Sequence, residues 1–349
     1  GAWPLIYIIS AIPCGAFLDR VGPRRALFIG AIAVAASAAA RGLSEGHLEL
    51  FCAVAILGVG GPLISVGAPK LIGLWFEGAD RGFAMGLYVT GPTAGNVVAL
   101  AGTNAVAMPL LGGDWRTVLF VYATFVLVSG FVWLTINSHP ASRAAERRIA
   151  AEPNDPQFAV FSELLRVPAI RLMLIISVGI FFFNHSLNNW LPQILRHGGM
   201  DAVTAGYWSS VPTVVGMVGA LIIPRLATPA RRYMILFGLI ASGFGAALLI
   251  RTMDMGVLPI GLVLQGLVRG SMSSIAILFL METKGVNARV MGVAGGMYFS
   301  AGEIGGVLGP LSVGAMFDAT GGFSAPLLML SGACVVQALL LARLRAVSR

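Results

Sequence analysis

Charged residues are scarce in this 349-residue chain: Asp, Glu, Lys and Arg make up 11% of it, against 57% hydrophobic residues. The mean hydropathy is +0.86. Because soluble domains typically carry about 25% charged residues, this composition excludes a water-soluble globular protein. A lipid bilayer must therefore solvate most of the surface.

Cysteine is also scarce, and the motifs of several functional classes are missing. Cys14, Cys52 and Cys334 show no CxxC or Cys/His spacing, which argues against a disulfide framework or a metal site. The sequence contains no HExxH, no GxSxG and no pair of intramembrane aspartates for a membrane-embedded enzyme, and no GxxxxGKS/T loop for nucleotide-driven pumping. We therefore expect neither an enzyme nor a bound cofactor or metal.

Long apolar runs dominate the chain instead. A membrane-spanning helix needs about 20 mainly apolar residues, whereas the strands of a membrane barrel alternate between apolar and polar residues. The sequence predicts an all-α integral membrane protein with eleven transmembrane helices, five before a polar stretch and six after it. They lie near residues 1–18, 26–43, 48–74, 82–107, 115–137, 168–192, 204–224, 233–250, 257–281, 290–314 and 324–344.

Basic residues give the chain a net charge of +8, which in a soluble protein would suggest a nucleic-acid partner. Here most of the 23 Lys and Arg residues fall in loops on the same side of the predicted membrane as Arg24 and Arg25. The opposite side receives Arg41, Arg116, Arg196 and Arg251. The positive-inside rule makes the basic side the cytoplasm of a bacterial-type inner membrane. We expect no nucleic-acid partner, and a cytoplasmic C-terminus.

The two sets of helices resemble each other at an offset of 206 residues. At that offset "LWFEGADRGFAMG" (Leu74–Gly86) falls on "LMETKGVNARVMG" (Leu280–Gly292), and both segments end in Met-Gly. The counterpart of the run at 168–192 would precede residue 1. We therefore expect two pseudo-symmetric halves of six helices whose first helix is missing here, with residues 1–137 holding parent helices 2–6 and residues 168–349 holding parent helices 7–12.

A polar segment at residues 138–167 separates the two halves. It is rich in Ala, Arg and Glu and contains three prolines before Phe161, a composition that does not bury itself. We predict a cytoplasmic linker in which Phe161–Val167 forms a short amphipathic helix at the membrane interface.

The stretch "GAFLDRVGPRR" (Gly15–Arg25) lies between the first two predicted helices. It resembles the loop signature between helices 2 and 3 of the major facilitator superfamily. The resemblance implies two six-helix halves, of which five plus six helices are present here, and secondary transport by alternating access. It also implies a conformational latch at the cytoplasmic rim, formed by Gly15, Asp19, Arg20, Gly22, Arg24 and Arg25.

Asp19 is predicted to be the central residue of this latch. An acid at a helix C-terminus opposes the helix dipole unless a cation or another helix N-terminus faces it. The resemblance suggests that the helix starting near Val290 faces Asp19. The second half has Arg225 at the position equivalent to Asp19, so we expect a single latch.

Gly-Pro steps occur at related places in the two halves. The resemblance implies helix kinks there, whereas small residues also simply allow close helix packing. The residues are Gly91, Pro92, Gly309 and Pro310. An arginine that many superfamily members carry in the fourth helix is absent from Ala53–Gly61, so a proton-relay role for such a residue is not expected.

Two ionisable residues fall near the middle of predicted helices, where each costs roughly 3 kcal/mol or more. We hypothesise that Arg269 binds an anionic substrate group, and that Glu303 carries a coupling proton or releases Arg269. The alternative is a fixed ion pair that only specifies helix packing. Lys70, nearer the cytoplasmic end of its helix, either attracts anions or extends to the surface.

Several uncharged or weakly basic polar residues complete the candidates for substrate binding or proton coupling. The alternative for each is an ordinary interfacial position or a hydrogen bond between helices. They are Asn184, His185, Asn188, Thr93, Asn96 and Gln265.

The sequence thus predicts a monomeric secondary active transporter of a small anionic organic solute. Transport would be driven by a proton gradient, by symport or antiport. Two alternatives remain: a proton-driven exporter of drugs, and a transporter-like receptor or scaffold that no longer moves solute.

Overall fold

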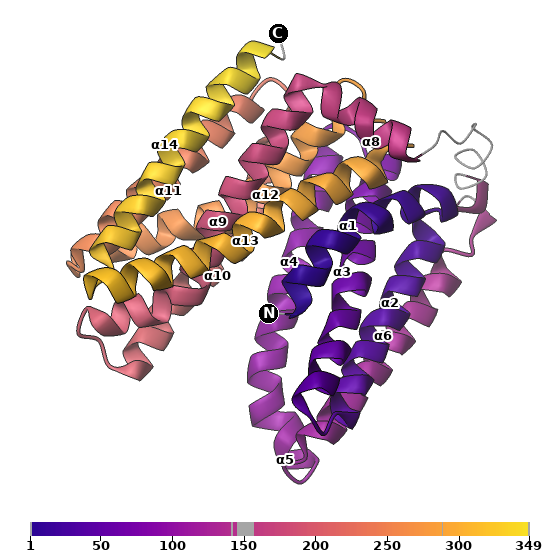
Figure 1. The fold of residues 1–349 in the computed structure, drawn as a ribbon, viewed down its shortest axis with the longest axis horizontal. Helices are drawn as coiled ribbons and strands as arrows, with labels where there is room; N and C mark the ends of the chain where they lie inside the picture. Colours follow the sequence, from indigo (N-terminus) through magenta and orange to yellow (C-terminus); the bar gives the residue numbers. More distant parts are fainter. Residues whose placement is uncertain (1, 141, 145–156, 288, 348–349) are drawn as a thin grey trace. The chain divides into compact units, whose positions relative to one another are not determined.

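The computed structural model describes residues 2–140, 142–144, 157–287 and 289–347, and each long element in these ranges is a helix (Figure 1). The first set comprises α1 (Ala2–Val21), α2 (Pro23–Leu43), α3 (His47–Trp75), α4 (Gly78–Gly102), the π-helical η1 (Thr103–Ala107), α5 (Met108–Leu110) and α6 (Trp115–Ile136). The second comprises α8 (Gln157–Arg166), α9 (Pro168–His197), α10 (Ala202–Leu226), α11 (Arg232–Thr252), α12 (Leu258–Met281), α13 (Met291–Thr320) and α14 (Ser324–Val347).

Each predicted apolar run coincides with a helix, the run at 82–107 being divided between α4 and η1. Nine of the described helices are long and apolar enough to span a bilayer: α1, α2, α3, α6, α9, α10, α11, α12 and α14. Helices α4 and α13 occupy the other two runs but do not meet that criterion. The all-α membrane fold is therefore found, while the count of eleven spans stays a prediction.

Local sequence explains where several helices begin. Gly22 turns the chain with φ 81°, and Pro23 begins α2, because proline lacks only an N–H that has no partner in the first helical turn. Asp114 caps α6 and Asp201 caps α10, each accepting two backbone N–H groups. The hydrogen bond from the Thr117 hydroxyl, followed by that from the Arg116 N–H, lowers the pKa of Asp114 below its ordinary value.

The predicted linker is described only at its two ends. Residues 141 and 145–156 lie outside the described residues. The short helix expected at Phe161–Val167 is present as α8, which begins earlier, at Gln157, and buries Val160 and Leu164. The predicted interfacial helix is thus confirmed as a helix.

The helices divide into two compact units that differ from the predicted halves by an exchange of two segments. Unit 1 consists of Gly1–Trp75, Ala94–Leu165 and Lys284–Ser300, and unit 2 of Phe76–Thr93, Arg166–Thr283 and Ala301–Arg349. Shifted back by 206 residues, Lys284–Ser300 falls on residues 78–94, almost the segment that unit 2 receives. The exchange therefore follows the sequence repeat, whereas the boundaries at 137 and 168 stay predictions.

In unit 1, α2 packs along α3 and α6, and α1 packs along α3. Cys14, Leu18, Ala26, Leu63 and Val66 form a buried apolar cluster between α1, α2 and α3. In unit 2, α12 packs against α10 and α11, while α14 packs against α11 and α9. Small residues make these approaches possible: a side-chain carbon at Gly266 would lie 2.7 Å from Val215 of α10.

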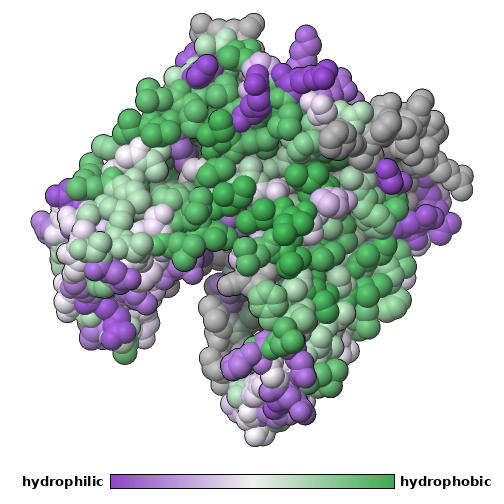
Figure 2. All heavy atoms as spheres, in the orientation of Figure 1, coloured by the Kyte–Doolittle hydropathy of each residue, from purple (hydrophilic) through white to green (hydrophobic). Residues whose placement is uncertain are grey.

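The outer faces of the helices carry large apolar side chains. Phe125 of α6 and Leu339 of α14, for example, are 70% and 67% exposed. Figure 2 shows hydrophobic residues along the flanks of the helices and hydrophilic residues gathered near helix ends. Such surfaces are stable only against lipid, as the composition predicts.

Candidate functional site

Asp19 lies at the end of α1 and is bound by three hydrogen-bond donors within unit 1. Its Oδ1 accepts the N–H of Gly292 at 2.8 Å and its Oδ2 accepts the N–H of Val293 at 2.9 Å, both in the first turn of α13. The ammonium of Lys70, on α3, donates to Oδ1 as well. The predicted pairing of Asp19 with a helix N-terminus is present, and a cation completes it.

Two glycines allow α1 and α13 to approach this closely. A side-chain carbon at Gly15 would collide with the backbone of Gly292, and one at Gly292 would collide with the Gly15 carbonyl and the Asp19 carboxylate. Further along the crossing, the Ser300 hydroxyl donates to the Ile8 carbonyl at 2.6 Å. The first residue of the signature, Gly15, therefore has to be a glycine, because the backbones of α1 and α13 are in contact at this point.

The other signature residues have different surroundings. Arg20 and Arg25 are exposed, and Gly22 forms the turn with its positive φ. Arg24 binds the end of α6: its Nη2 donates to the Ser138 hydroxyl at 3.1 Å, and its carbonyl accepts the Trp133 indole N–H at 3.0 Å. Of the predicted latch residues, Gly15 and Asp19 are the ones whose contacts with α13 are described above.

One of the two alternatives for Lys70 is wrong. The suggestion that its ammonium extends to the surface does not hold, because the residue is 1% exposed and its Nζ is bonded to Asp19. A buried carboxylate compensates a buried ammonium, and leaving either one alone is costly. Lys70 and Asp19 are far apart in the sequence, so no local pattern predicted that they would pair.

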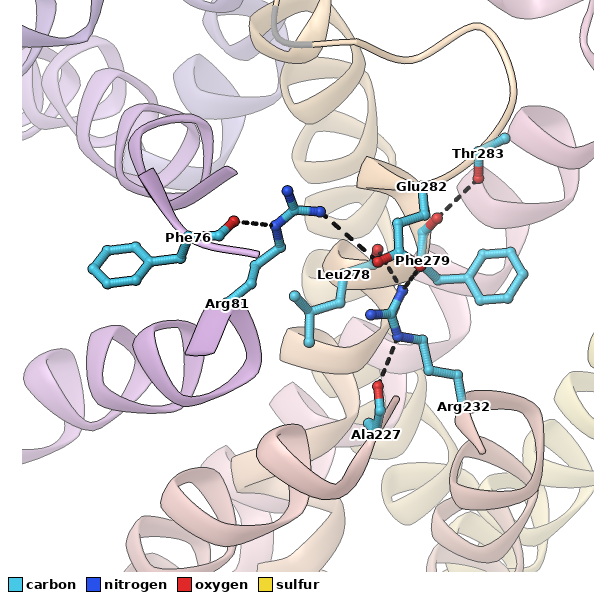
Figure 3. Close-up of polar contacts among 8 residues, drawn as sticks. All are labelled: Phe76, Arg81, Ala227, Arg232, Leu278, Phe279, Glu282 and Thr283. Atoms are coloured by element: carbon cyan, nitrogen blue, oxygen red, sulfur yellow. Dashed lines mark hydrogen bonds and ion pairs between the residues drawn. The ribbon is translucent and has the colours of Figure 1, made fainter. Parts of the chain in front are cut away.

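A second ion cluster, which sequence reasoning missed, lies in unit 2 around Glu282 (Figure 3). Arg232 of α11 donates from Nη1 to Glu282 and, at 3.1 Å, to the Leu278 carbonyl. Arg81 of α4 approaches Glu282 at 3.8 Å and donates from Nε to the Phe76 carbonyl at 2.8 Å. The cluster joins the start of α4, the start of α11 and the end of α12.

The expectation of a single latch stays a prediction, and this cluster differs from the Asp19 contact in its residues. Arg225, which occupies the position equivalent to Asp19, lies 5.5 Å above the ring of Phe83 and forms no ion pair among the described residues. The acid of this cluster, Glu282, lies at the end of α12 instead. Comparing the two halves position by position could not reveal it, although Glu282 lies within the repeated segment Leu280–Gly292.

Glu282 should matter more to stability than its partner Arg81. Arg232 is 3% exposed, so Glu282→Gln removes a charge-assisted bond from a buried guanidinium and is expected to cost about 1.5–3 kcal/mol. The Arg81 pair is longer and more exposed, so Arg81→Ala should cost less than about 1 kcal/mol. Thermal unfolding of the two variants in detergent measures the difference, and equal losses would contradict this ranking.

Glu303 and His185 are brought together where α13 crosses α9. Gly302, Gly305 and Gly309 face α9 so closely that a side-chain carbon at Gly305 would collide with the Val178 carbonyl. Glu303 is 5% exposed, and its Oε2 has no hydrogen-bond partner among the described residues. The same glycine row provides the close packing foreseen for Gly309, beside Pro310, whose carbonyl accepts the Trp190 N–H at 3.0 Å.

Arg269 is half-buried on α12 and forms no ion pair with Glu303 or with any other acid in the described ranges. Gln265, one helical turn away, is fully buried, and neither of its amide atoms has a partner there. Asn184 Oδ1 on α9 is similarly unpartnered. Buried polar atoms are normally satisfied, so these atoms are the ones that water or a polar solute would bind.

The remaining candidates are less enclosed. Asn188 and Asn96 are exposed, and the Thr93 hydroxyl donates within its own helix to Val89 at 3.4 Å. Gly91 and Pro92 are exposed too, and α4 continues as a helix through them. The role of these five residues therefore stays a prediction.

A family model described as Major Facilitator Superfamily matches residues 1–310. The chain belongs to the major facilitator superfamily. It is therefore a secondary transporter of a small molecule and a multi-pass integral membrane protein, and not an enzyme.

Three similar proteins from bacteria illustrate the range of its relatives. An uncharacterized transporter, YycB, of Bacillus subtilis is 25% identical, the match covering 96% of this chain and 81% of the relative. A quinolone resistance transporter of Acinetobacter baumannii is 26% identical, covering 93% and 79%. A D-galactonate transporter of Escherichia coli is 25% identical, covering 97% and 83%.

Among solved structures, the human organic anion transporter MFSD10 (TETRAN) superposes with a TM-score of 0.77 at 16% identity, covering 97% of this chain and 82% of that one. At this identity the likeness shows the fold alone. The family model thus establishes the family, and the structural likeness agrees with the fold.

Proposed function

We propose that this superfamily member carries a small anionic organic solute across a bacterial inner membrane, driven by a proton gradient. The observation that carries the proposal is Arg269, a half-buried guanidinium within α12 without an acidic partner in the described residues. A cation at membrane depth is costly unless something compensates it. A carboxylate of the solute supplies that compensation in bidentate geometry.

Two further observations support an anionic solute. Gln265 lies one turn from Arg269 with its amide unsatisfied, and an amide N–H₂ donates to a carboxylate or hydroxyl. The D-galactonate transporter of Escherichia coli is a relative of 25% identity, matched over 97% of this chain and 83% of its own length, whose name states that it carries an organic acid. We propose that the solute is held by Arg269 and Gln265, with Asn184 as a neighbouring polar group.

The proposed cycle alternates access by rocking the two halves, with the linker and the C-terminus in the cytoplasm and the chain acting as a monomer. In this cycle the contact of Asp19 and Lys70 with the first turn of α13 forms and breaks once per turnover. Solute binds elsewhere, so this contact governs rate and not affinity.

Arg269 provides the direct test. In proteoliposomes with an imposed pH gradient, Arg269→Gln should reduce D-galactonate uptake by at least about tenfold, since a charge-assisted bond contributes about 1.5–3 kcal/mol. Arg269→Lys should recover part of the uptake, because it keeps the charge without the planar fork. Arg251→Gln, at the end of α11, is the matched control and should leave uptake unchanged.

A drug exporter is the second candidate, favoured by the quinolone resistance relative. The same vesicles loaded with a fluorescent quinolone separate the two functions. Quinolone efflux that persists in Arg269→Gln, with no wild-type uptake of D-galactonate, would replace the anion proposal. Absence of transport for every solute, together with stability that no solute changes, would instead favour the transporter-like receptor or scaffold that no longer moves solute.

A further inference from the structure

Glu303 and His185 approach the same point beside Gly306. A side-chain carbon built at Gly306 would lie 2.6 Å from His185 Nδ1 and 3.1 Å from Glu303 Oε2. Any residue other than glycine at 306 would therefore occupy the space that the imidazole and the carboxylate both face. The three residues form one compact group within unit 2.

The walls of this group are helical, and aromatic side chains and the Ser186 hydroxyl contribute to them. Phe181, one turn before His185, has its ring centroid 5.5 Å from the imidazole and packs over Gly302. On the next turn of α13, Gly309 lies against the Phe182 backbone. Water thus has little access from α9, and Glu303 is 5% exposed.

The surrounding elements offer few other charges. Helix α12 contributes Arg269, which forms no ion pair with Glu303. In α10, α11 and α14, charged residues occur only near helix ends, and α9 and α13 add further charged groups only near their own ends, while α13 also carries the buried phenol of Tyr298. The groups near the helix ends are Arg225, Arg232, Arg251, Arg343, Arg345, Arg171, Arg196, His197 and Asp318.

We propose that Glu303 and His185 form a single proton-binding site, in which one proton is exchanged between the carboxylate and the imidazole across the space left by Gly306. An ionised carboxylate without a cation partner is costly in an apolar environment, and proton uptake removes that cost. Imidazole both accepts and donates protons at physiological pH. Two ionisable groups that face the same small space titrate as a pair when they interact by more than about one pK unit.

This inference rests on the proposed proton coupling and gives it a location. It also separates two tasks within unit 2: Arg269 remains available for the solute anion, while the proton resides on α9 and α13. Glu303 would then not need to compete with the solute for Arg269.

Infrared difference spectroscopy on the purified protein in lipid tests the site without any solute. As pH is varied, the wild type should show a carboxylic-acid carbonyl band that disappears in Glu303→Gln. In His185→Gln the midpoint of that band should move by about one pH unit or more. Gly306→Ala should move it too, whereas Gly332→Ala, whose added carbon meets nothing within 4 Å, should not.

A Glu303 band whose midpoint ignores both His185→Gln and Gly306→Ala would overturn the shared site. This result is independent of the solute, so it is distinct from failure of the proposed function. If the band is coupled as expected but a pH gradient never drives D-galactonate uptake, the proton site stands and the proposed function fails.

Transport measurements then test whether the site couples the proton to solute movement. Glu303→Gln should retain exchange of D-galactonate at equal concentrations on both sides, and should lose accumulation driven by a pH gradient by about tenfold or more. Loss of exchange and accumulation together would overturn the coupling role, because it would place Glu303 in folding or solute binding.

Discussion

Asp19→Asn should lower the rate of solute transport by roughly 10- to 100-fold while leaving solute affinity nearly unchanged, since charge-assisted hydrogen bonds contribute about 1.5–3 kcal/mol. The carboxylate accepts from the Gly292 N–H, the Val293 N–H and Lys70. An asparagine has one acceptor oxygen, and its N–H₂ would face a donor. The state in which α13 contacts α1 is therefore weakened, and Arg269 is untouched.

Transport kinetics in proteoliposomes measure this effect as a fall in maximal rate at constant half-saturation. Arg25→Gln is the matched control, because Arg25 belongs to the same signature but is exposed. A rise in half-saturation without a change in maximal rate would contradict the role given to Asp19.

Stability provides a second readout for the same pair. Asp19→Asn leaves Lys70 buried without a counter-ion, a situation that typically costs about 3–5 kcal/mol. The double variant Asp19→Asn, Lys70→Met removes that charge and should recover most of the thermal stability but not the transport rate. Recovery of both would mean that Asp19 acts only by neutralising Lys70.

The helices were predictable because the signal for each is local. About 20 apolar residues in a row suffice to indicate a span, and Gly22 with Pro23 marks a turn without reference to the rest of the chain. The pairing of Asp19 with the start of α13 was also predictable, because an acid at a helix C-terminus needs a positive partner and the superfamily resemblance named one.

Contacts across helices were not predictable in the same way. They depend on how each helix is rotated about its axis and on how closely two backbones approach. A fixed ion pair between Arg269 and Glu303 was one alternative from the sequence, but no such pair forms between these two described residues, and the glycine row of α13 places His185 beside Glu303 instead. Lys70 and Glu282 found partners on other helices for the same reason, and neither partner is near in sequence.

The Met-Gly pairs that revealed the repeat now have a physical explanation. Gly292 lies against Gly15 of α1 in unit 1, and Gly86 lies against the Ala220 carbonyl of α10 in unit 2. The preceding residues, Met85 and Met291, are both buried. The repeat has thus kept the residue at which two helices cross with backbones in contact.

Gly292→Ala and Gly86→Ala should therefore each slow transport by about tenfold or more, because an extra methyl group in a fully packed contact typically costs 1–3 kcal/mol. Alanine is intrinsically the better helix former by about 1 kcal/mol, so the same change at an open site has the opposite sign. Gly95→Ala, whose added carbon meets nothing within 4 Å, should leave transport unchanged and raise the melting temperature slightly. Equal rates in all three variants would show that the crossings do not control the transport cycle. Slowing by Gly292→Ala alone would instead leave the α1 crossing as the rate-controlling contact.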